Sequence, residues 1–138
     1  MLEKKKLDIV IPVYNEGELI IDTLNSIKDN LKCTFNILIC YDIDNDNTLQ
    51  AIDKSLLDKS NIFYVKNKFT GAHGAVMSGI KETLSEIVLV IPADDNYNTP
   101  RIQNMYEMIV DENIDVLCPD RFIERNSIID GPFIKFMI

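Results

Sequence analysis

The feature that most constrains this fold is a regular alternation between short apolar runs and segments of helical periodicity. The apolar runs are rich in Ile and Val and have no polar face, which is typical of strands buried on both sides of a parallel sheet. The segments between them repeat their apolar residues every three or four positions, as amphipathic helices do. The predicted strands cover residues 7–13, 35–41, 62–65, 87–91 and 115–118.

Four helices are predicted between these strands from the spacing of their apolar residues. The second helix has capping residues at its start, Asp46 and Asn47, and the fourth opens with Thr99 as N-cap before Pro100. Five strands joined by four helices predict an α/β fold, with a doubly wound, mostly parallel sheet and helices on both faces. The apolar residues that mark the first three helices are, in chain order, Leu19, Ile20, Leu24, Ile27 and Leu31; Leu49, Ile52 and Leu56; Val76, Met77, Ile80 and Leu84. The fourth helix is expected to bury Ile102, Met105, Tyr106 and Ile109.

Length and charge limit the classes of function. The 138 residues predict one domain over 1–138. A formal net charge of −8 argues against nucleic acid as a partner, although carboxylates can still bind a nucleotide through a divalent cation. Cys33, Cys40 and Cys118 show no metal-ligand spacing, and the two in apolar runs, Cys40 and Cys118, are expected to be buried thiols. No segment has the character of a signal peptide or membrane span, so a cytoplasmic location is expected, or the cytoplasmic face of a membrane in a longer parent protein.

Polar residues follow the predicted strands at the sheet edge where such folds bind ligands. They include Tyr14 to Glu16, an acidic turn over 42–46, glycines at 71 and 74, and Asp94 with Asp95. Carboxylates that converge on one edge repel one another unless a cation is present, so a divalent metal bridging to phosphate is expected. Neither GxxxxGK[ST] nor GxGxxG occurs, which excludes the usual P-loop and dinucleotide-binding enzymes.

Four motifs together resemble the family 2 glycosyltransferases of GT-A fold. They are VIPVYNEGELI (10–20), the acidic turn, GAHGAVMSG (71–79) and IPADDNYNTP (91–100), and their order and spacing match the family over about residues 7–125. The GxHxAxMxG pattern most resembles the branch that transfers sugars to polyprenyl phosphates. The resemblance implies an inverting, metal-assisted transferase that takes a sugar from a UDP- or GDP-linked donor to an acceptor such as polyprenyl phosphate.

The resemblance also implies roles for residues of the first two loops. Pro12 and Val13 lead the backbone into the nucleotide pocket, which continues through Asn15 and Glu16. Tyr14 offers a ring face for base stacking, and Asp42 offers an acceptor for a base N–H.

Further roles are implied for later residues. Gly71 and His73 are expected in the nucleotide site, where His73 has either a phosphate-side or a structural role in its loop. Arg121 is expected to contact phosphate through its guanidinium fork. Asp94 and Asp95 are the expected ligands of Mg²⁺ or Mn²⁺. Asp94 is also expected to belong to the nucleotide-binding site.

The sequence departs from the family pattern at two places. Pro92 replaces the first Asp of the metal motif, leaving a form that resembles Asp94-Asp95-Asn96 of some relatives. The catalytic base belongs to a later acceptor-side motif and is expected beyond Ile138, because Asp130 is the only candidate in 126–138 and lacks that context. The chain is therefore expected to be the donor-binding part of a longer protein.

Three other interpretations compete with the transferase. A nucleotide-sugar-binding module that lacks the base would be inactive by itself and keeps the same motifs. A calcium loop is suggested by Asp42, Asp44 and Asp46, but a strand rather than a helix precedes them. A signalling receiver domain needs an Asp after the third strand, where this chain has Lys66-Asn67.

Overall fold

A four-stranded, all-parallel sheet organises the chain in the computed structural model, which describes residues 6–119. The strands are β1 (Leu7–Val13), β2 (Phe35–Tyr41), β3 (Ile62–Lys66) and β4 (Ile87–Val90), in the spatial order β3-β2-β1-β4. The helices are α1 (Leu19–Asn30), α2 (Asn47–Lys54), α3 (Gly71–Glu82) and α4 (Ile102–Glu112), with a 3₁₀ turn, η1 (Thr99–Arg101), before α4. This is the predicted α/β, GT-A-like class, and the bounds of β1 and β2 are as predicted.

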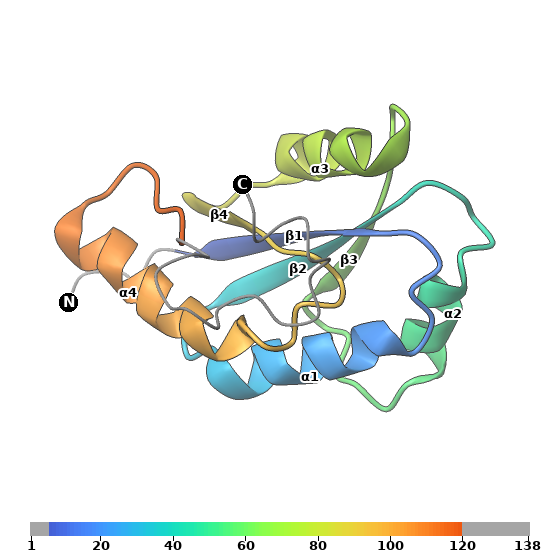
Figure 1. Cartoon of the computed structure of the whole chain (residues 1–138), viewed down its shortest axis with the longest axis horizontal. Helices are drawn as coiled ribbons and strands as arrows, with labels where there is room; N and C mark the ends of the chain where they lie inside the picture. The colour runs from blue at the N-terminus through green and yellow to red at the C-terminus, as the bar shows by residue number, and fades with distance from the viewer. Residues whose placement is uncertain (1–5, 120–138) are drawn as a thin grey trace, which may run out of the picture.

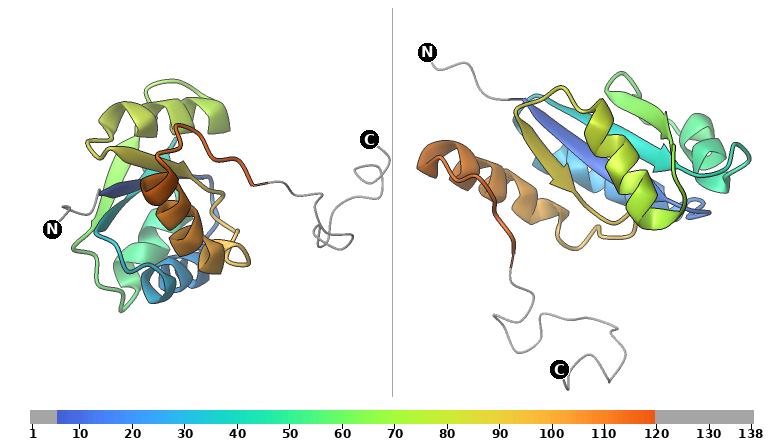
Figure 2. Two further views of the ribbon diagram at one scale, coloured as in Figure 1. Left: turned by 90° about the vertical axis from the view of Figure 1, so that its left-hand side faces the viewer. Right: turned by 90° about the horizontal axis from the view of Figure 1, so that it is seen from above.

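Helices cover both faces of the sheet. Figure 1 shows α3 on one side of the strands and α1, α2 and α4 on the other, and Figure 2 shows the same three layers from two further sides. β1 lies between β2 and β4, so the chain reverses its strand order beside β1. Ligands of such sheets bind at this switch point, outside the carboxyl ends of the strands.

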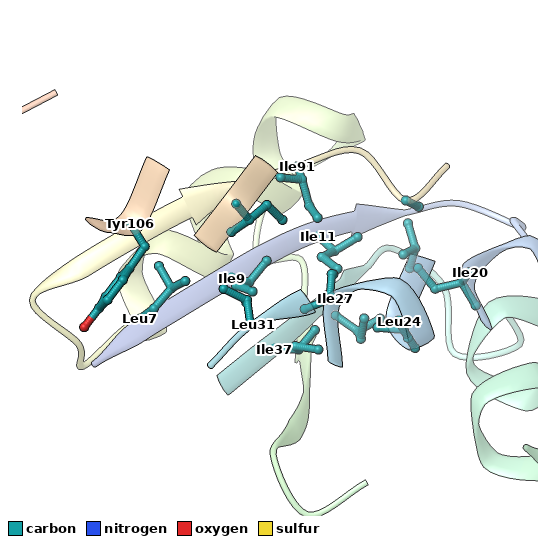
Figure 3. Packing of buried hydrophobic residues seen from close by; sticks show 14 of the residues in the cluster. Leu7, Ile9, Ile11, Ile20, Leu24, Ile27, Leu31, Ile37, Ile91 and Tyr106 are labelled. Atoms are coloured by element: carbon teal, nitrogen blue, oxygen red, sulfur yellow. The ribbon is translucent and has the colours of Figure 1, made fainter. Parts of the chain in front are cut away.

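The main core lies between β1 and the three-helix face. Ile9 and Ile11 of β1 are fully buried, as are Ile20, Leu24 and Ile27 along one side of α1. Figure 3 shows these side chains in one layer, together with Leu7 and Tyr106 at the far end of the sheet. Alternation along β1 sends Val10 to the opposite face, where it joins a smaller cluster beneath α3.

The predicted third helix is confirmed as α3, but the apolar residues that mark it in the sequence are not the ones that it buries. Gly74, Ala75, Ser78 and Gly79 face the sheet, whereas Met77, Ile80 and Leu84 are exposed. A Cβ on Gly79 would come within 2.5 Å of Cys40 Sγ and of a Val10 methyl, so the helix backbone approaches the strands more closely than any larger residue permits. The helix therefore packs through its smallest residues and not through its most hydrophobic ones.

The predicted fifth strand is absent: residues 115–118 form no strand, and Cys118 is exposed, not buried. The segment lies beside β4, because Val116 and Leu117 line the same cavity as Val88 and Leu89, but no ladder joins them. Val116 is 76% exposed, so this apolar run lacks burial on two faces. An apolar run becomes a strand only where its backbone finds a partner edge.

The fourth helix also begins differently from the prediction. Asn98, not Thr99, precedes the 3₁₀ turn η1, and the Thr99 hydroxyl donates to the Asn96 carbonyl at 2.7 Å instead of capping a helix amide. Of the predicted buried face, Ile102 and Tyr106 are buried. Within residues 6–119, none of the helices combines the length and apolar character that a bilayer crossing requires.

Candidate functional site

The strand registers bring three predicted site residues to one edge of the sheet. Val13 pairs with Tyr41, so Tyr14 and Asp42 follow β1 and β2 at the same level. Val10 pairs with Val90, and Asp94 stands four residues beyond Val90 just as Tyr14 stands four beyond Val10. β1 and β4 are neighbours, as the sequence predicts for a switch-point site.

The loop between β1 and α1 carries an exposed aromatic ring on an unusual backbone. Pro12 is half-buried and Val13 is buried within β1, and Tyr14 beyond them is 62% exposed. Asn15 and Gly17 have φ of 54° and 57°, the left-handed region that favours Gly and tolerates Asn. The Tyr14 ring is therefore presented to solvent at the carboxyl edge, in the position that the sequence predicts for base stacking.

Side chains at the start of α2 hold this loop. Both carboxylate oxygens of Asp46 accept from the Asn15 amide, at 3.1 and 3.0 Å. Thr48 Oγ1 accepts from the Glu16 amide at 2.9 Å, and Asn47 Oδ1 accepts from the Gly17 amide at 2.8 Å. Asp46 also caps α2 by accepting from the Thr48 amide at 2.8 Å, which confirms its predicted capping role.

Asp42 joins the ends of β2 and β3 to the start of α3. One carboxylate oxygen accepts from Asn67 Nδ2, and the other accepts from the Gly71 amide at 3.2 Å. The Asn67 side chain also accepts from the Ser78 hydroxyl at 3.1 Å, so it ties β3 to the middle of α3. Asp42 is half-buried, and a carboxylate has about four lone-pair sites, so these two bonds leave it able to accept from further donors.

The acidic turn does not form a cluster of unpaired carboxylates. Asp44 pairs with Lys66 at 2.6 Å on the surface, while Asp42 and Asp46 accept from the amide donors described above. Each carboxylate of the turn therefore has its own protein donor, and the expected mutual repulsion is relieved without a cation. Throughout residues 6–119, no group of three or more Asp, Glu, His or Cys side chains is placed to hold a metal ion.

The loop after β4 leaves one carboxylate open. Asp95 accepts from the Asn98 amide at 3.1 Å and from Asn98 Nδ2 at 2.9 Å, which closes a local turn. Asp94 is exposed and has no side-chain hydrogen bond or ion pair within the described part of the chain. Carboxylate oxygens suit Mg²⁺ and Mn²⁺, and Asp94 is the more available of the two predicted ligands.

The remaining predicted residues have mixed placements. Gly71 is the first residue of α3 and has φ of 73°, in the left-handed region that favours glycine. Nothing lies within 4 Å of an added Cβ, so glycine is favoured here by the backbone conformation and not by lack of space. His73 lies exposed in the first turn of the same helix, and Glu16 is half-buried in the first loop. Arg121 lies outside the described residues, as does Asp130.

Sequence reasoning missed how four residues hold this edge together. Asn67 was noted only as the position where a receiver domain would need an Asp. Asp46 was noted in the acidic turn and, with Asn47, as a helix cap, and Thr48 was not singled out. Their partners are 11 to 32 residues away in sequence, so no local pattern indicates them. The available signal was the strand–turn–helix order, which predicts that the start of α2 lies beside the loop after β1.

Comparison with known proteins gives a family and several relatives. The model for glycosyl transferase family 2 matches residues 8–130. UDP-Glc:alpha-D-GlcNAc-diphosphoundecaprenol beta-1,3-glucosyltransferase WfaP of Escherichia coli is 27% identical over 92% of this chain and 50% of its own length. Undecaprenyl-phosphate 4-deoxy-4-formamido-L-arabinose transferases are also similar: that of Yersinia pestis bv. Antiqua (strain Angola) is 28% identical, and that of Yersinia pseudotuberculosis serotype IB (strain PB1/+) is 26% identical.

Both Yersinia relatives align with 90% of this chain but with only 39% of their own length. The chain thus spans half or less of the length of these curated relatives. The family match nevertheless covers most of the chain, and it includes every loop described above. On these grounds the chain belongs to glycosyl transferase family 2.

Proposed function

We propose that this chain is the donor-binding part of a glycosyltransferase that moves a sugar from a nucleoside diphosphate sugar to an acceptor, with inversion and with help from a divalent metal. The observation that carries the proposal is the convergence of Tyr14, Asp42 and Asp94 at the carboxyl edge of a family 2 fold. An aromatic face, a hydrogen-bond acceptor and an open carboxylate together suit a base, its ring N–H and a metal-bound diphosphate.

The base-binding role belongs to the first two loops. The exposed Tyr14 ring can stack on a uracil or guanine, because every base offers a π-face and stacking contributes about 1–3 kcal/mol. Asp42 can accept from a base N–H while keeping its bonds to Asn67 and Gly71, since a carboxylate has about four lone-pair sites. Pro12, Val13, Asn15 and Glu16 supply the backbone that carries these groups.

The diphosphate role belongs to the later loops. When bound at Asp94 and Asp95, Mg²⁺ or Mn²⁺ would neutralise negative charge that develops on the departing diphosphate. Asp94 is free to contribute its oxygens, whereas Asp95 must share its own with Asn98. Gly71, His73 and Arg121 are the proposed phosphate-side residues, and the exposed start of α3 favours an anion there.

A polyprenyl-linked acceptor is proposed from the relatives. The Escherichia coli relative is named for a diphosphoundecaprenol acceptor, and the Yersinia relatives are named for undecaprenyl phosphate. The acidic catalytic base is proposed to lie in an acceptor-side part of a longer protein. A nucleotide-sugar-binding module without turnover is the second candidate, because it would use the same edge of Tyr14, Asp42 and Asp94 without a catalytic base.

Asp42→Ala tests the base pocket. Loss of its charge-assisted hydrogen bond should weaken UDP or GDP binding in calorimetry by about 1–3 kcal/mol. The matched control is Asp44→Ala in the same turn, whose carboxylate pairs with Lys66 on the surface. Thermal unfolding of each variant separates lost binding from a loosened start of α3.

The binding measurements distinguish a base contact by Asp42 from a purely structural role in the turn. Weaker binding by Asp42→Ala alone supports a base contact, and equal binding by wild type, Asp42→Ala and Asp44→Ala would make Asp42 a turn residue only. Both candidates predict that this chain alone binds the nucleotide without transferring sugar, because the proposed base lies in a longer protein. Sugar transfer to an undecaprenyl phosphate by the purified chain would contradict that location of the base and rule out the module.

A further inference from the structure

We propose that Asp46, Asn47 and Thr48, here called the α2 latch, position the nucleotide-contacting loop, so that the latch sets the affinity for the nucleotide without touching it. The inference rests on the proposed function, because it assigns nucleotide contact to Tyr14 and its neighbours. It adds three positioning residues to the site.

The latch consists of three consecutive side chains that receive three consecutive backbone amides. Asp46 receives the Asn15 amide, Thr48 that of Glu16 and Asn47 that of Gly17, at 2.8 to 3.1 Å. A weaker return bond joins the Asn47 amide to Asn15 Oδ1 at 3.4 Å. Every amide of the loop between Asn15 and Gly17 is therefore bonded to a side chain of α2.

The loop needs such restraint because its backbone is unfavourable. Asn15 has φ of 54°, a left-handed conformation that costs free energy in a residue with a Cβ. Tyr14 and Asn15 are exposed, so few other contacts keep this conformation. Without the latch the loop would sample other conformations, and the apparent nucleotide affinity would fall by the fraction that remains competent.

Burial fixes the position of two latch residues, so they can hold the loop in place. Asp46 and Thr48 are both fully buried, and Thr48 lies in the first turn of α2, a helix that packs through Ile52 into the main core. The loop itself is at the surface, so its release opens a local region and leaves the core intact. The latch can therefore change binding while the protein remains folded.

The sharpest test replaces the Thr48 hydroxyl without changing its shape. In Thr48→Val the Glu16 amide loses its acceptor, whereas Thr48→Ser keeps an oxygen at the same position. Thr23→Val is the matched control, because Thr23 is equally buried in α1 and its hydroxyl has no hydrogen-bond partner among the described residues. Asn47→Ala, at an exposed position, provides a second latch variant if Thr48→Val fails to fold.

Calorimetric titration of the full chain with UDP and with GDP, each with Mg²⁺, measures the effect. Thr48→Val and Asn47→Ala should bind at least about fivefold more weakly than wild type, as the loss of an amide's acceptor implies. Thr48→Ser and Thr23→Val should bind as wild type does. Hydrogen exchange of the Glu16 amide should be faster in Thr48→Val than in wild type, and it should be unchanged in Thr48→Ser and Thr23→Val.

The outcomes distinguish this inference from the proposed function. If wild type binds neither nucleotide, the proposed function fails, and this inference fails with it. If wild type binds and Thr48→Val and Asn47→Ala bind equally well, the latch alone is overturned. Equal weakening by Thr48→Val and Thr48→Ser would also overturn it, because side-chain volume and not the hydroxyl would then set the affinity.

Discussion

A single buried carboxylate, Asp8, holds the turn between α3 and β4 to the start of β1. It accepts from Asn36 Nδ2, from the Ser85 hydroxyl, and from the amides of Leu84 and Ser85, at 2.8 to 3.0 Å. Burial alone would raise the pKa of Asp8, but these hydrogen bonds outweigh it and hold the pKa below the ordinary value of 3.8. Asp8 therefore stabilises the fold in its ionised form.

The sign of this pKa shift predicts a pH dependence of stability. A carboxyl with a lowered pKa stabilises the fold fully above about pH 4, and this contribution is lost as the pH falls through the pKa of the folded state. Asp8→Asn should lower the free energy of unfolding by about 2–3 kcal/mol at pH 7, because an amide NH₂ would face buried donors. The difference from wild type should shrink at pH 3.

Urea unfolding followed by circular dichroism at both pH values measures this effect. Asp58→Asn is the control, since the pKa of Asp58 is also lowered, chiefly by the Ser60 amide, but its carboxylate is exposed. Asp58→Asn should change stability far less than Asp8→Asn. An Asp8→Asn loss that is the same at pH 7 and pH 3 would contradict the ionised-anchor role.

At the scale of elements, the close approach of α3 to the sheet depends on Gly79. In Gly79→Ala the new Cβ would overlap Cys40 Sγ and a Val10 methyl, so the helix must move away from β1 and β2. Alanine favours helices over glycine by about 1 kcal/mol, but overpacking typically costs about 1–3 kcal/mol. We expect a net loss of unfolding free energy of about 1 kcal/mol, measured by urea denaturation.

A double-mutant cycle identifies the cause of that loss. Cys40→Ala removes the sulfur that the new Cβ would meet, so Gly79→Ala should cost less in the Cys40→Ala background. Cys33→Ala is the control background, because Cys33 belongs to the core on the other face of the sheet. Equal costs in both backgrounds would show that steric overlap with Cys40 does not determine the position of α3.

The same elements show what the sequence could and could not predict. β1 and β2 have the predicted bounds, because an apolar, β-branched run is a local signal. The buried face of α3 was not predicted, because Gly74 and Gly79 pack by their smallness and not by their hydrophobicity. Residues 115–118 have the composition of a strand but no paired edge, which no local pattern can reveal.

The candidate site was also predictable only in part. The order of loops along the chain predicted that Tyr14, Asp42 and Asp94 would reach one edge, and the registers of β1, β2 and β4 agree. Which partner each side chain takes was not predictable, since Asp42 bonds to residues 25 and 29 positions away. The turn's carboxylates looked like a repelling cluster in sequence, but the fold supplies a separate donor for each.

At the scale of the whole molecule, we expect nucleotide and metal to bind together at the carboxyl edge. The chain has a formal charge of −8, and a diphosphate brings more negative charge to an edge that already carries Asp94 and Asp95. A divalent cation held by these carboxylates would reverse the local sign of charge and so favour binding of the phosphate groups. Each ligand should then tighten the other by the same factor, because coupling is reciprocal.

The most direct test of this claim is calorimetric titration of the chain with UDP and GDP, in Mg²⁺ or Mn²⁺ and again in chelator, for wild type, Asp94→Asn and Asp95→Asn. We predict that metal tightens nucleotide binding by about 5- to 150-fold, the usual range for coupled sites. Asp94→Asn should abolish this coupling, and Asp95→Asn, whose carboxylate is shared with Asn98, should reduce it less. Nucleotide affinity that is equal with and without metal in wild type would contradict the metal bridge, and no nucleotide binding in either condition would contradict the donor site itself.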